Sequence, residues 1–117
     1  MIRFDKESVR ACDQALANAL HRLYGDVDLE AMCAIRNRDR VAPYGGDPPE
    51  YAENDLPIIT ANLVKELYGK EPTQDELLEL LRVRFDAFVA VVEAPDYLES
   101  FLTEMSSRYK LGLLSNY

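Results

Sequence analysis

This 117-residue chain has few of the histidine and cysteine side chains that bind zinc or act as nucleophiles. A single histidine, His21, and two cysteines, Cys12 and Cys33, which lack CxxC spacing, give no zinc-binding pattern. His21 lies beside the apolar stripe of an expected helix, so we interpret it as a surface or edge residue. The two cysteines fall in expected helices, where two buried thiols are the commoner outcome and a disulfide the alternative.

Two charged clusters have both a functional and a simpler interpretation. The run 36–40, Arg-Asn-Arg-Asp-Arg, could bind an anionic substrate tail. The commoner interpretation is a solvated helix end, where cations are favoured near the last carbonyl groups. Asp75, Glu76 and Glu79 are spaced so that two of their carboxylates could act as a pair. They lie just after a helix start, however, where the helix dipole stabilises acidic side chains. We therefore expect these carboxylates to be structural.

The composition excludes several classes of function. The chain has 21 acidic and 13 basic residues, a formal net charge of -8, and such a field repels a phosphate backbone, so no nucleic-acid partner is expected. No apolar run approaches the roughly 18 residues of a membrane helix, so no membrane partner is expected. Residues 1–5 contain an acid and lead into no apolar signal segment, which argues for a cytoplasmic protein.

Apolar spacing predicts four helices in residues 1–94. The first spans about 6–24 between Asp5 and Gly25, and the second begins after Asp28 and fades into a loop through its polar end. A third is expected at about 56–68, and the fourth begins at the capping box Thr73-Gln74-Asp75-Glu76 and closes at Ala94-Pro95. We expect the fourth helix to be central to a bundle. Its expected inward stripe consists of Leu77, Leu81, Phe85, Phe88 and Val92, widened by Leu78, Val83, Val89 and Val91.

The pattern changes in residues 95–117. Asp96 could cap a helix through about Tyr109, whose inward side chains would be Leu98, Phe101, Leu102 and Met105. An apolar run at 111–114 follows and is typical of a strand buried on both faces. The expected fold class is therefore mainly α: a four-helix bundle in residues 1–94, then one helix–strand unit in residues 95–117.

Residues 95–116 resemble the stretch around the second motif of haloacid dehalogenase-like (HAD) hydrolases, where a proline and an amphipathic helix lead into a strand ending in Ser-Asn. The resemblance implies that Ser115 hydrogen-bonds the substrate phosphoryl group and that Asn116 shapes the pocket floor. A hydroxyl donor at the carboxyl end of a parallel strand suits that chemistry, because the transferring group spreads charge over its oxygens. The simpler alternative is a polar strand end or a turn.

The helical part also resembles this family, whose first cap class inserts a four-helix bundle between its first and second motifs. The 95–117 unit would then belong to an incomplete Rossmann-like core. The long irregular stretch 42–54 contains Tyr44, Gly45 and Gly46. These three residues would form a substrate-selecting loop, and a plain connecting loop is the alternative.

The chain departs from the family pattern in what it lacks. The family nucleophile is the first Asp of a DxDx[TV] motif, whereas Asp5 is followed by Lys6-Glu7. The third-motif lysine and the acids that hold magnesium would lie beyond Tyr117. We therefore predict a fragment of a phosphatase- or dehalogenase-type hydrolase with no catalytic residue, no metal ligand and no cofactor of its own.

The expected substrate of the full-length enzyme, which would use magnesium, is a small phosphorylated or halogenated acid. The alternative function is a non-catalytic acidic helical interaction module. Because its strand partners are missing from this sequence, the 95–117 unit is expected to mediate homo-oligomer formation.

Overall fold

The structure of the chain, a computed structural model, describes residues 5–42, 45 and 55–112. The described residues form α1 (Lys6–Tyr24), α2 (Leu29–Val41), α3 (Leu56–Tyr68), α4 (Gln74–Val91) and α5 (Leu98–Arg108). This order confirms the mainly α fold class. The expected strand at 111–114 is not shown, because residues 111 and 112 have no regular secondary structure and the next two lie outside the described residues.

Short-range polar contacts set the helix ends where the sequence predicted them. The Asp5 carboxylate accepts the backbone N–H of Ser8 at 2.9 Å and caps α1. Gly69 ends α3 with φ of 66°, a left-handed conformation that favours glycine. At α4 the Thr73 hydroxyl accepts the Glu76 N–H at 3.2 Å, and the Glu76 carboxylate accepts the Thr73 N–H at 2.8 Å. The predicted capping box is therefore confirmed.

Two predicted helix ends were wrong. The second helix does not fade at its polar end, since α2 continues to Val41. Arg36 and Arg38 within it form ion pairs with Asp13 of α1 and Glu66 of α3, respectively. These ion pairs stabilise the polar segment in its helical conformation. Asp96 does not cap α5, whose N-cap is Tyr97, without a side-chain hydrogen bond.

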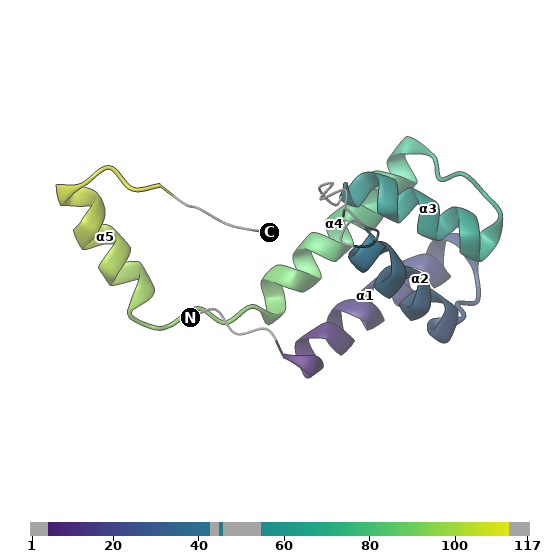
Figure 1. Cartoon of the computed structure of the whole chain (residues 1–117), viewed down its shortest axis with the longest axis horizontal. Helices are drawn as coiled ribbons and strands as arrows, with labels where there is room; N and C mark the ends of the chain where they lie inside the picture. The colour runs from purple at the N-terminus through teal and green to yellow at the C-terminus, as the bar shows by residue number, and fades with distance from the viewer. Residues whose placement is uncertain (1–4, 43–44, 46–54, 113–117) are drawn as a thin grey trace.

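α1 and α4 pack against each other in opposite directions, with α3 beside both α4 and α2 (Figure 1). The end of α1 lies against the start of α4, where Arg22 pairs with Glu79 and the Tyr24 hydroxyl donates to Glu76 at 3.1 Å. The start of α1 therefore lies near the end of α4. Figure 1 shows α5 apart from this bundle, and it makes no extensive contact with the other described helices.

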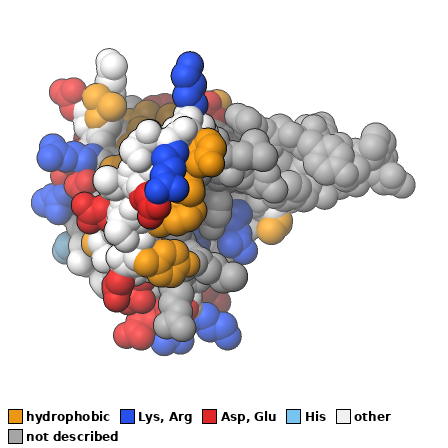
Figure 2. All heavy atoms as spheres, turned by 90° about the vertical axis from the view of Figure 1, so that its left-hand side faces the viewer, with side chains coloured by type: hydrophobic (Ala, Val, Ile, Leu, Met, Phe, Trp, Pro, Cys, Tyr) orange, Lys and Arg blue, Asp and Glu red, His pale blue; other side chains and the backbone are white. Residues whose placement is uncertain are grey.

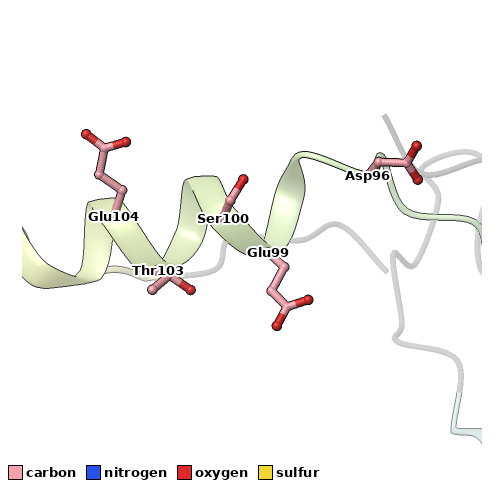
Figure 3. Close-up of a pocket in the computed structure, with 5 residues that line it drawn as sticks. All are labelled: Asp96, Glu99, Ser100, Thr103 and Glu104. Carbon is pink, nitrogen blue, oxygen red and sulfur yellow. The ribbon is translucent and has the colours of Figure 1, made fainter.

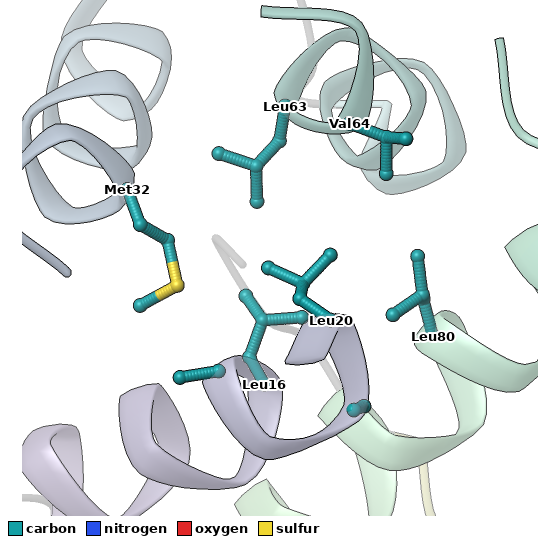
Figure 4. Close-up of a cluster of buried hydrophobic side chains, with 8 residues drawn as sticks. Leu16, Leu20, Met32, Leu63, Val64 and Leu80 are labelled. Carbon is teal, nitrogen blue, oxygen red and sulfur yellow. The ribbon is translucent and has the colours of Figure 1, made fainter. Parts of the chain in front are cut away.

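The core lies where α1 to α4 meet. Figure 4 shows aliphatic side chains from all four helices pointing toward one another, with a thioether contributed by α2. Burying each such side chain contributes about 1.5–3 kcal/mol, so this cluster accounts for the association of the four helices. Its largest fully buried members are Leu20, Met32, Leu63, Val64 and Leu80.

The expected inward stripe of α4 was only partly right: Leu77 and Leu81 are half-buried, and the widening residue Val83 packs against the core. Phe85 is 65% exposed and Phe88 38% exposed, and the widening residues Leu78 and Val89 are also exposed. The residue of α4 that is fully buried is Leu80.

The inward row of α4 instead runs at four-residue steps through Glu76, Leu80 and Arg84. Glu76 accepts from Tyr24 of α1, and Arg84 donates to Thr60 of α3. Because two of its three members are charged, an apolar pattern could not reveal this row.

The expected inward stripe of α5 was also only partly right, since Leu98 and Met105 are half-buried. Phe101 is 51% exposed, and Leu102 is exposed as well. Figure 2, which looks onto the α5 side, shows hydrophobic side chains at the surface among charged ones. This helix makes no extensive contact with another described helix.

No described helix is both long and apolar enough to span a membrane.

Candidate functional site

The site residues predicted from the resemblance fall mostly outside the described ranges. Ser115, Asn116, Tyr44 and Gly46 all lie there, so their roles stay predictions. Gly45 is described: it is exposed, and its N–H donates to the carbonyl of Ala42 at 3.1 Å.

The other chemical candidates have structural partners. His21 is exposed, as expected, with its Nδ1 3.6 Å from the Asp26 carboxylate. Glu76 and Glu79 lie at the start of α4, where the first closes the capping box and the second pairs with Arg22. The interpretation of these carboxylates as structural is supported by these contacts. Among residues 5–42, 45 and 55–112, no group of three or more His, Cys, Asp or Glu side chains could hold a metal ion.

The Arg36–Arg40 run divides into two different environments. Arg38 lies near the surface and shares its guanidinium between Asp39 and Glu66, with a bidentate contact to Glu66 at 2.6 and 3.0 Å. These bonds raise the pKa of Arg38 above its ordinary value. Arg40 is exposed. Arg36 instead turns toward the bundle, so only this residue contributes to a partly buried cluster.

Arg36 forms the first half of that cluster with Asp13 of α1. Its Nη1 lies 2.8 Å from Asp13 Oδ1, and the two side chains are only 24% and 18% exposed. Cys33 Sγ donates to the other oxygen of Asp13 at 3.8 Å, a weak thiol bond. The Nε of Arg36 is buried and has no hydrogen-bond partner among the described residues. One donor of this guanidinium is therefore left unsatisfied.

Arg84 of α4 and Thr60 of α3 form the second half. Arg84 Nη1 donates to Thr60 Oγ1 at 3.0 Å. The Thr60 hydroxyl, which is fully buried, donates its own hydrogen to the carbonyl of Leu56 at 2.7 Å. Thr60 can therefore only accept from Arg84, and this bond positions Nη1 of the guanidinium.

Burial lowers the pKa of Arg84, and the neighbouring charge of Arg36 lowers it further, against the opposite effect of Asp13. Burial also raises the pKa of the Cys12 thiol, which lies near both arginines. Two guanidinium groups and one carboxylate therefore interact electrostatically within the bundle, with a net charge of about +1 in a chain of -8.

The two cysteines border this cluster as free, partly buried thiols. Burial is the largest cause of the raised pKa of Cys33, with Asp13 adding to it. Both thiols therefore stay protonated and weakly nucleophilic near neutral pH. The structure supports the reduced thiols rather than the disulfide, although neither thiol is fully buried.

A shallow depression on α5 is a weaker candidate. Its lining residues are Asp96, Glu99, Ser100, Thr103 and Glu104. Figure 3 shows Glu99 and Glu104 pointing to opposite sides of the helix, so the lining does not converge on one ligand. Three carboxylates would also repel the phosphorylated or acidic substrates expected from the sequence.

Sequence reasoning missed Asp13, Thr60 and Arg84 as site residues. They lie on three different helices and form no local motif. The fourth helix has two arginines within its apolar run, Arg82 and Arg84, and the sequence does not show which of them faces the bundle.

The sequence matches no protein-family model, and neither the curated proteins nor the solved structures yield a match.

Proposed function

We propose that this chain supplies the helical cap and the phosphate-binding second motif of a HAD-like hydrolase of the phosphatase or dehalogenase type. In this proposal residues 1–94 form the substrate-selecting cap, and residues 95–117 belong to the catalytic core. Ser115 donates a hydrogen bond from its hydroxyl to the substrate phosphoryl group, and Asn116 shapes the floor of that pocket. The substrate is a small phosphorylated or halogenated acid.

The observation that carries the proposal is the antiparallel packing of α1 and α4. Because these are the first and last helices of the bundle, the chain enters and leaves the bundle at the same end. A module with this property can be inserted between two strands of another domain without separating them. A cap of the first class is such an insertion.

The separation of α5 is a second support. Its residues Phe101 and Leu102 and its N-cap Tyr97 are exposed, and it makes no extensive contact with another described helix. An amphipathic helix of this kind requires an apolar surface to cover it. In the proposal that surface is the sheet of the catalytic core.

The proposed roles of the chain stop at binding and positioning. The HAD-type nucleophile and its metal acids have no counterpart in residues 1–117, so this segment alone is inactive. Magnesium, which the full-length enzyme would use, finds no fitting set of ligands among the described residues.

The coding sequence that flanks the segment is the direct test. We expect a strand ending in DxDx[TV] shortly before residue 1, and a lysine and paired acids after residue 117. In a protein that contains both this segment and its flanking sequences, Ser115→Ala should lower kcat/KM by about 100-fold, which is the effect of losing one oxyanion donor. Ser115→Thr keeps the hydroxyl and should retain most of the activity.

The isolated chain provides the complementary assay. Residues 1–117 should not hydrolyse p-nitrophenyl phosphate with or without magnesium. Turnover that disappears on changing a residue within the segment would contradict the fragment interpretation. Flanks without the aspartate motif would favour the alternative, a non-catalytic acidic interaction module that uses the exposed apolar residues of α5.

A further inference from the structure

We propose that Arg36 and Arg84 form a binding site for a small monocarboxylate anion inside the four-helix bundle. The site lies among α1, α2, α3 and α4 and does not depend on the proposed hydrolase function. Its elements are the two guanidinium groups, the Asp13 carboxylate that orients one of them, and the Thr60 hydroxyl that orients the other.

The first argument is that the positive charge of Arg84 is incompletely compensated. Asp13 neutralises Arg36 through their 2.8 Å contact, whereas Arg84 bonds only to the neutral Thr60 hydroxyl among the described residues. Partial burial disfavours the charged form of Arg84, because the guanidinium loses part of its hydration. The charge of Arg36 adds to this effect, and that of Asp13 offsets part of it. An anion between the two arginines would remove both penalties.

The second argument is the supply of free donors. A guanidinium has five N–H groups, and the structure gives Arg84 one acceptor, Thr60 Oγ1. Arg36 keeps its Nε buried without an acceptor among the described residues. Because Thr60 donates its hydrogen to Leu56, it cannot bond the ligand and acts as a positioning residue. The remaining N–H groups of the two arginines are the ligand-binding groups.

Charge and shape select the ligand class. Two guanidinium groups and one carboxylate give a net charge of about +1, which a monocarboxylate would neutralise. A phosphate dianion would leave a net negative charge in a partly buried site. The planar carboxylate also matches the guanidinium fork, which binds two oxygens at once. The low exposure of Arg36 and Asp13 restricts the ligand to a small molecule.

A solution experiment can test this site directly. Nuclear magnetic resonance of the full chain with ¹⁵N-labelled arginine would follow each Nε–H during titration with sodium acetate. Sodium chloride at equal ionic strength is the reference. We expect saturable shifts at Arg36 and Arg84 with acetate and none with chloride, whereas the exposed Arg82 should not shift saturably.

Matched variants identify the groups responsible. Arg84→Met should abolish saturable acetate binding, and Arg84→Lys should weaken it about tenfold because the bidentate fork is lost. Arg82→Met, on the same helix and with a side chain 84% exposed, should leave acetate binding unchanged.

Asp13→Asn gives the opposite and more specific result. It removes the competing negative charge, so acetate should bind more tightly, although the loss of the Arg36 ion pair reduces the thermal midpoint of the free protein. A purely structural arginine cluster would show the reduced midpoint without any gain in affinity. Acetate shifts that are linear and equal to those with chloride would overturn the site. Tighter binding of inorganic phosphate than of acetate would overturn the assignment to a monocarboxylate.

Discussion

The bundle α1–α4 and the separate helix α5 are built from the same kind of amphipathic sequence but reach different states. In the bundle, Leu20, Leu63 and Leu80 come from three helices and bury one another. In α5, Phe101 and Leu102 lie on a comparable stripe and remain exposed. The difference shows that an amphipathic pattern specifies a helix with an apolar side, whereas burial of that side depends on a second surface.

The two regions also differ in their polar contacts. Ion pairs and hydrogen bonds such as Arg38–Glu66 and Tyr24–Glu76 link helices within the bundle. The polar contacts of α5 are local, for example Arg108 with Glu104 four residues away. Exposed pairs of this kind contribute little to stability. The bundle is therefore expected to unfold as a cooperative unit to which α5 adds little.

Truncating a core side chain of the bundle should have the largest effect on the stability of the protein. Leu20→Ala removes a fully buried side chain where the four helices meet and should lower the free energy of unfolding by about 2–5 kcal/mol. Leu78→Ala is the matched control, because this leucine is 57% exposed on α4, and it should change stability by about 0.5 kcal/mol at most. Urea unfolding followed by circular dichroism measures both. Equal losses would show that the described core does not hold the helices together.

Removing one charge at the start of α4 should have a smaller, pH-dependent effect. The bond from the Thr73 N–H lowers the pKa of Glu76 from its ordinary value of 4.5, and the Tyr24 hydroxyl adds to this. A lowered folded-state pKa stabilises the protein above the unfolded value, and this contribution is lost as pH falls through the folded pKa. Glu76→Gln keeps an acceptor at this position, so it isolates the charge.

Thermal midpoints at neutral pH and at about pH 3 measure this effect. The midpoint of Glu76→Gln should be lower than that of the unmodified chain at neutral pH, and the two should converge in acid. Asp75→Asn is the control, since Asp75 lies in the same first turn but outside the capping box. A difference between Glu76→Gln and the unmodified chain that persists unchanged in acid would contradict the role of the charge.

Deleting the separate region should have the smallest effect on stability. A chain that ends at Ala94 should unfold at the same temperature as the full chain, because α5 makes no extensive contact with the bundle. Light scattering should show that the full chain self-associates through residues 95–117 and that the shortened chain is monomeric. A lower midpoint for the shortened chain, or a monomeric full chain with slow amide exchange in α5, would indicate an intramolecular partner for that helix.

The helix boundaries were predictable from sequence to within a few residues. Asp5 and Gly25 limit α1, Asp55 and Gly69 limit α3, and Thr73 begins α4. These signals can be read locally because the atoms that bond at a helix end belong to residues within four positions of each other. The predicted end of α2 was less accurate. This helix continues to Val41, and its polar residues form ion pairs with α1 and α3, which local sequence signals do not reveal.

The tertiary structure alone decided which side of each helix is buried and which polar groups meet. On α4 the sequence favoured an apolar stripe through Phe85, whereas the packed helix turns Leu80 and Arg84 inward. The pairing of Arg36 with Asp13, near Arg84, depends in the same way on helices distant in sequence. Side-chain spacing fixes the periodicity of a helix but leaves its rotation about its own axis to be set by neighbouring helices, which no local pattern encodes.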